Sequence, residues 1–140
     1  MNDTDEPTTA ADGQPHAPGA TVPGDAHPVA VAAARAADEK GATDVVALEV
    51  GPILGICESF VIASGRNPRQ VRAIADEVEE QLRVLLDRKP RSVEGTTEQR
   101  WILLDYGDVI VHVFLDTERE FYRLERLYRD APRIEWEPVD

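Results

Sequence analysis

Residues 101–115 read WILLDYGDVIVHVFL, and this stretch decides the fold of the chain. Two runs rich in β-branched and aromatic residues flank Gly107-Asp108, a suitable two-residue turn in which glycine supplies the positive φ at the first central position. The pattern therefore predicts a hairpin with strands at 100–106 and 109–115. A two-residue turn also fixes the pairing, so that Trp101 faces Phe114 and Leu103 faces His112.

This register sorts the hairpin side chains onto two faces. We call the first the aliphatic face and assign it to the core; it holds Ile102, Leu104, Tyr106, Val109, Val111, Val113 and Leu115. We call the second the mixed face, because it combines large apolar side chains with two titratable groups; it holds Trp101, Leu103, Asp105, Ile110, His112 and Phe114. Either a second helical layer covers the mixed face and Asp105 and His112 satisfy each other or nearby backbone, or part of it stays open and binds a partner protein.

Working outward from the hairpin, the pattern predicts helices and strands on both sides of it. The clearest helix starts at Pro68, with Asn67 as N-cap and Gln70 in a box-like position, and ends at 88–90. A capping box at Thr117 and Glu120 predicts the last helix, whose apolar stripe is Phe121, Leu124, Leu127 and Tyr128. The remaining predicted elements are a helix at 28–40 and strands at 45–50, 59–63 and 92–93. This order predicts an α/β fold, a mixed sheet of about five strands with flanking helices.

Composition divides the chain into a tail, a domain and a second tail. Residues 1–28 are acidic, proline-rich and free of Lys and Arg, so we expect them to be disordered. Residues 29–130 form the predicted domain, and 131–140 an extended C-terminal tail. The formal net charge of -12 argues against general nucleic-acid binding and favours a basic partner. No run long and apolar enough to span a membrane and no secretory signal is visible, and Cys57 is the single cysteine, so we expect a cytoplasmic protein without disulfides.

Several motifs together resemble one known family. They are Phe60-Val61-Ile62-Ala63-Ser64-Gly65, Arg69-Gln70-Val71, Ala73-Ile74-Ala75-Asp76, Glu94-Gly95, the hairpin string from Trp101 to Phe114, and Phe121-Tyr122-Arg123-Leu124-Glu125-Arg126-Leu127-Tyr128. In this order, over roughly residues 30–130, they strongly resemble the Iojap-like ribosomal silencing factor family. Tyr128 is a small departure, since relatives often carry tryptophan there.

The resemblance implies a nucleotidyltransferase-like fold without transferase activity, and no cofactor or metal. It also implies binding to the large ribosomal subunit through its ribosomal protein number fourteen, which would keep the small subunit from joining and so repress translation. A homodimer of the free protein is a further expectation. The residues it suggests for partner contact are Trp101, Leu104, Asp105, Tyr106, Asp108 and His112. Leu104 and Tyr106 conflict with their place on the aliphatic face, and Leu104 is the weakest member of the set.

The competing hypothesis is a homodimeric nucleotide-binding or nucleotidyltransferase-like protein. Nucleotidyl transfer needs a Gly-Ser turn and an Asp-x-Asp pair for two metal ions. The chain offers only Ala63-Ser64-Gly65 and no Asp-x-Asp, and His112 is the single histidine of the domain. Arg66, Arg69 and Arg72 form a basic patch at a predicted helix start, where minor contact with ribosomal RNA is possible. A solvated helix edge is the more ordinary interpretation of that patch.

Overall fold

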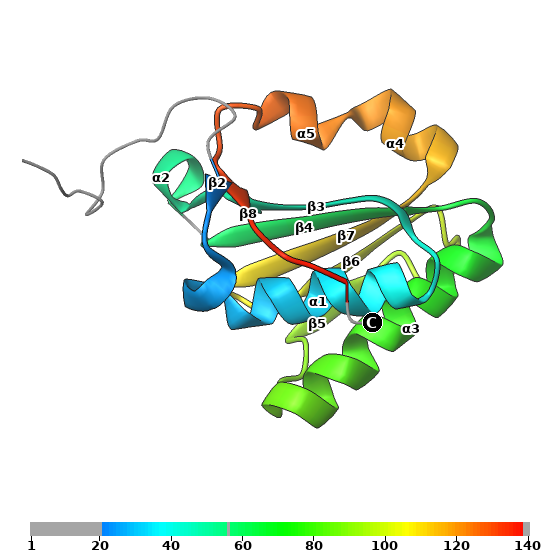
Figure 1. The fold of residues 1–140 in the computed structure, drawn as a ribbon. Coiled ribbons are helices and arrows are strands. Elements are labelled where there is room, and N and C mark those ends of the chain that lie inside the picture. The colour runs from blue at the N-terminus through cyan, green and yellow to red at the C-terminus, as the bar shows by residue number, and fades with distance from the viewer. Residues whose placement is uncertain (1–20, 56, 139–140) are drawn as a thin grey trace, which may run out of the picture.

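The computed structural model describes residues 21–55 and 57–138 as a mixed α/β fold. A seven-stranded sheet lies between two helical layers, with α1 and α3 on one side and α4 and α5 on the other (Figure 1). The strand order is β2-β8-β3-β4-β7-β6-β5. The strands are β2 (Thr21–Val22), β3 (Thr43–Glu49), β4 (Ser59–Gly65), β5 (Ser92–Glu94), β6 (Trp101–Asp105), β7 (Val109–Leu115) and β8 (Arg133–Ile134).

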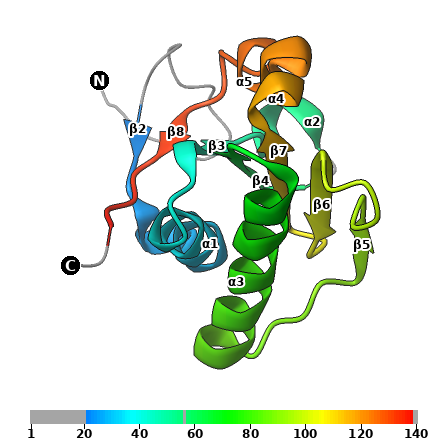
Figure 2. The same ribbon diagram turned by 90° about the vertical axis from the view of Figure 1, so that its right-hand side faces the viewer.

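The sheet contains the five predicted strands and two further short ones. The central pair β4–β7 is parallel, whereas β3–β4, β6–β7 and β5–β6 are antiparallel. Figure 2 shows β5 at the outer edge of the sheet, beyond β6. The extra strands β2 and β8 pair with each other in parallel, and β8 continues the sheet from β3. Each has only two residues, too few for the sequence pattern to reveal.

The two extra strands correct the predicted boundaries. Residues 21–28, predicted as part of a disordered tail, instead form β2, a 3-10 turn at Gly24–Ala26 and the first residue of α1. The C-terminal segment, predicted only as extended, supplies β8 and is fixed further on by a hydrogen bond of 2.7 Å from Arg35 Nε to the Glu137 carbonyl. Residues 1–20 lie outside the described residues.

The hairpin has the predicted register. Trp101 pairs with Phe114, Leu103 with His112 and Asp105 with Ile110. The turn is closed by a hydrogen bond of 2.9 Å from the Tyr106 amide to the Val109 carbonyl, and Gly107 has a φ of 89°. The prediction of two faces therefore rests on a pairing that the structure contains.

The aliphatic face packs on α1 (Pro28–Glu39) and α3 (Pro68–Leu86). The predicted cap of α3 is confirmed, since Asn67 Oδ1 accepts a hydrogen bond of 2.8 Å from the Gln70 amide. Side chains at helical spacing along α3 are then buried against the sheet: Val71, Ile74, Ala75, Val78 and Leu82. This layer is the larger of the two apolar clusters.

The opposite layer is built from short helices, α2 (Gly51–Leu54), α4 (Asp116–Tyr122) and α5 (Leu124–Leu127). The prediction of one capped helix here is wrong in two respects. Leu115 is the N-cap of α4 and makes no side-chain capping bond, and Arg123 adopts a left-handed φ of 50° that separates α4 from α5. The break turns Leu127 out of the predicted apolar stripe, so that it is 71% exposed.

Across the described residues, no helix is long and apolar enough to cross a membrane.

Candidate functional site

Trp101 lies on the mixed face at the start of β6, where it contacts His112 and Phe114. Its indole Nε1 donates a hydrogen bond of 3.1 Å to Nδ1 of His112, and its ring lies 4.7 Å from the Phe114 ring, centroid to centroid. The indole remains partly exposed. Because an indole can only donate, Nδ1 must be unprotonated, so the neutral tautomer of His112 carries its hydrogen on Nε2.

His112 itself is buried beneath this surface. Its ring contacts the edge of Phe60 at 4.7 Å, and burial lowers its pKa from 6.5 to about 4. Its Nε2 atom is buried and has no hydrogen-bond partner among the residues that the structure describes. Of the two expected arrangements, the direct pairing of Asp105 with His112 is wrong, because His112 accepts from Trp101. The other is confirmed for Asp105, which accepts a hydrogen bond from the nearby backbone amide of Gly107. His112 is therefore a neutral side chain that orients the exposed tryptophan.

The two aspartates stabilise the hairpin turn. Asp105 Oδ1 accepts a hydrogen bond of 2.8 Å from the Gly107 amide and lies 3.2 Å from Arg91 Nε. Asp108 accepts from both Arg88 amino groups, at 2.7 and 3.4 Å, and hydrogen bonding by Arg88 lowers the pKa of Asp108. Both carboxylates remain partly accessible, so they can meet a partner while they hold the turn.

Leu104 and Tyr106 lie on the other side of the sheet, which corrects their place in the predicted contact set. Leu104 is 0% exposed and Tyr106 is 5% exposed, both in the cluster under α3. Alternation along β6 points them away from Trp101. Burial, with a smaller contribution from Glu79, raises the pKa of Tyr106 to about 12. Within the described part of the chain, its hydroxyl has no hydrogen-bond partner.

Other partly exposed residues lie on the same side of the sheet as Trp101, and they were not among the predicted contact residues. Leu103 and Ile110 share its face of the hairpin and follow from alternation alone. Tyr128 of the α5 region reaches the same cluster through a ring contact of 5.2 Å with Phe60. The position of Tyr128 depends on the break at Arg123, which no local sequence signal announces.

The basic patch lies on the opposite layer, at the start of α3. Arg66, Arg69 and Arg72 are all exposed, and Arg72 forms an ion pair of 3.0 Å with Asp76. This placement matches the solvated helix edge and leaves RNA contact as a proposal. Within residues 21–55 and 57–138, no group of three or more His, Cys, Asp or Glu side chains is arranged to hold a metal ion.

Comparison with known proteins supplies the family. Residues 23–140 match the family model described as "Ribosomal silencing factor during starvation". The chain belongs to the ribosomal silencing factor family. The resemblance inferred from the hairpin string is thus confirmed, and with it a place among factors that regulate translation.

Relatives of this family cover most of the chain. A ribosomal silencing factor of Bacillus subtilis is 43% identical over 103 residues, which are 71% of this chain and 84% of that protein. The chloroplast protein Iojap of Zea mays is 38% identical over 76% of this chain and 46% of its own length.

Solved structures share the fold. A crystal structure of a protein from Chromobacterium violaceum has a TM-score of 0.69 at 29% identity, covering 72% of this chain and 83% of that one. One from Bacillus halodurans has a TM-score of 0.63 at 38% identity, covering 77% and 94%. The mixed α/β architecture of this ribosomal silencing factor family member therefore agrees with experimental structures of similar chains.

Proposed function

We propose that the protein binds the large ribosomal subunit through its ribosomal protein number fourteen and blocks joining of the small subunit. It acts by occupying a surface and carries out no catalysis. Family membership supports the ribosome as the target. The mixed face and the adjoining hairpin turn supply the contact. Trp101 and Asp105 on that face and Asp108 in the turn are the accessible members of the predicted set.

The observation that carries this proposal is the orientation of Trp101. The hydrogen bond that Trp101 donates to His112, together with the ring of Phe114, fixes the indole while part of Trp101 stays in solvent. Tryptophan is enriched among residues that dominate binding energy, and an ordered side chain loses less entropy on binding. The net charge of -12 favours association with a basic protein surface.

Density-gradient sedimentation of purified large and small subunits, with and without the protein, tests the proposal. We expect the protein to migrate with the large subunit and the joined-ribosome peak to shrink. A protein that stays at the top of the gradient while the subunits join normally would overturn it.

A matched pair of tryptophan variants locates the contact. Trp101→Ala is expected to weaken large-subunit binding about thirtyfold, roughly 2 kcal/mol. Trp136→Ala is the control. Trp136 is also partly buried, but it packs against the apolar cluster that contains α1 residues, on the other side of the sheet from the mixed face. Equal losses in the two variants, or none in a folded Trp101→Ala protein, would remove Trp101 from the contact.

Two secondary proposals concern other partners. A homodimer of the free protein through the mixed face would hide Trp101, and sedimentation velocity over a range of concentrations detects it as a shift that Trp101→Ala abolishes. Minor contact of Arg66, Arg69 and Arg72 with ribosomal RNA predicts that replacing all three with Gln flattens the salt dependence of large-subunit binding. An unchanged salt slope would dismiss that contact.

A further inference from the structure

A cavity of about 640 Å³ lies on the α4 side of the sheet, away from the hairpin residues discussed above. Its described lining is polar throughout: Thr43, Asp44, Ser64, Asp116, Arg119, Glu120, Arg123 and Arg126. These residues come from the start of β3, the end of β4, and helices α4 and α5. The volume falls within the range of small-molecule sites.

The base of the cavity carries an arginine that the fold holds in place. Arg119 is only 7% exposed, and its Nη1 donates to Ser64 Oγ at 2.8 Å and to the Thr43 carbonyl at 3.5 Å. Fixing a side chain of this length costs considerable conformational entropy. Because folding already fixes Arg119, ligand binding does not incur that cost again. The guanidinium is thereby pre-organised at one position in the cavity.

Two further arginines complete a set of cationic donors. Arg123 and Arg126 are exposed on the same cavity. Arg123 is engaged by Glu120, whose carboxylate lies 3.3 Å away. Among the residues that the structure describes, no carboxylate lies within ion-pair distance of Arg126. Arg126 is therefore available to a ligand. Arg123 becomes available when a ligand replaces the exposed carboxylate of Glu120.

The three carboxylates of the described lining differ from Arg119 in their exposure. Asp44, Asp116 and Glu120 are all exposed, whereas Arg119 is the one charged lining residue that is buried. Water and salt screen exposed charges far more than buried ones. An anion that enters the cavity therefore meets a cationic donor at its base and carboxylates that can turn toward solvent.

The cavity also lies where α/β sheets commonly bind ligands. Strands β4 and β7 run parallel, and both end at this edge, β4 at Gly65 and β7 at Leu115. Ligands of open α/β sheets bind beyond the carboxyl ends of the strands. Ser64 and Asp116 are lining residues beside these two ends.

We propose that this cavity binds the phosphate group of a small phosphorylated molecule. Arginine guanidinium groups match phosphate oxygens in charge and in the geometry of paired hydrogen bonds. The phosphate would lie between Arg119, Arg123 and Arg126, with the hydroxyl groups of Thr43 and Ser64 as further donors. The exposed carboxylates would then accept from hydroxyl or amino hydrogens on the rest of the ligand.

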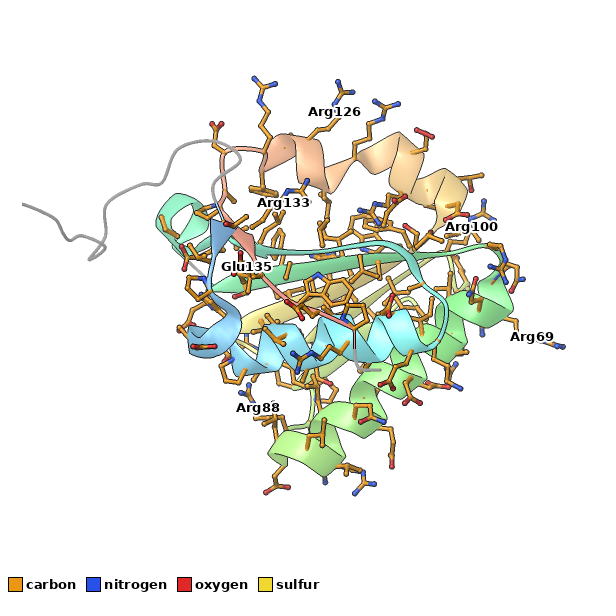
Figure 3. All side chains as sticks on the ribbon, in the orientation of Figure 1. Arg69, Arg88, Arg100, Arg126, Arg133 and Glu135 are labelled. Carbon is orange, nitrogen blue, oxygen red and sulfur yellow. The ribbon has the colours of Figure 1, made fainter. Side chains whose placement is uncertain are left out.

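Calorimetric titration of the full chain with inorganic pyrophosphate, at about 0.15 M ionic strength, tests the proposal. Arg126→Gln should weaken binding about tenfold. Arg83→Gln is the control, since Arg83 is also exposed and belongs to α3, which lies across the sheet from Arg126 (Figure 3). It should change the affinity less than twofold.

Four outcomes would overturn the proposal. The first three are the lack of saturable binding, equal weakening by Arg126→Gln and Arg83→Gln, and binding of a single-stranded RNA oligomer that pyrophosphate does not displace. The third would assign the arginines to a nucleic-acid backbone. Because Arg119→Lys keeps the charge but loses the paired donors, a folded Arg119→Lys protein with undiminished affinity would also contradict it.

Discussion

The two faces of the central sheet are built from the same strands but differ in what covers them. On the aliphatic face, Ile102, Leu104, Val111 and Val113 are fully buried under two long helices. On the mixed face, Trp101, Leu103, Asp105 and Ile110 remain partly exposed beside α4 and α5, which have seven and four residues. One strand alternation thus separates fully buried core residues from residues that solvent partly reaches.

The largest expected effect compares adjacent leucines on β6. Leu104→Ala should lower the free energy of unfolding by about 3 kcal/mol, because it leaves a cavity in a closed core. Leu103→Ala should cost about 1 kcal/mol or less, since Leu103 is already partly in water. Urea denaturation measures both. Similar losses would show that the mixed face is as closely packed as the aliphatic face.

A second test uses the buried histidine under the mixed face. Burial lowers the pKa of His112 from 6.5 to about 4, so the unfolded chain binds more protons than the folded one between these values. Stability contributed by this group is complete above pH 6.5 and is lost as pH falls toward 4. We expect a loss of about 2 kcal/mol between pH 7 and pH 5.

The His112→Gln variant isolates that contribution. Its absolute stability is free to differ from that of the parent, because the readout is the change between pH 7 and pH 5 in each protein. The variant should lose about 2 kcal/mol less over this interval. If both proteins follow the same pH dependence, His112 titrates in the fold as it does in water, and the mixed face is wetter than the structure implies.

Helix capping also differs between the two layers, because α3 has a side-chain cap and α4 has none. Asn67 caps α3, so Asn67→Ala should destabilise the protein by about 1 kcal/mol. The matched change Thr117→Ala lies in the first turn of α4, where no side-chain cap is present, and should have an effect near zero. Thermal denaturation compares the two. A comparable loss of stability in Thr117→Ala would mean that Thr117 caps α4 after all, as the sequence predicted.

Sequence reasoning reached the features that depend on local pattern. The hairpin register, the Asn67 cap and the burial of Leu104 follow from turn chemistry and periodicity. It missed β2 and β8, because a two-residue strand owes its place to the edge it pairs with. The left-handed conformation of Arg123 could not be predicted either, since the apolar residues on both sides of it have the spacing of one continuous helix. Long-range packing decides these positions and therefore which residues surround Trp101.

Tyr106 gives the smallest and most discriminating effect. Its hydroxyl is buried and has no partner in residues 21–55 and 57–138, so Tyr106→Phe removes an unsatisfied polar group while keeping the ring. We expect the free energy of unfolding to stay the same or rise by up to about 1 kcal/mol. Large-subunit binding should not change, because the ring lies on the aliphatic face. Weaker binding by a stable Tyr106→Phe protein would mean that the partner reaches this hydroxyl, and that the two faces are not functionally separate.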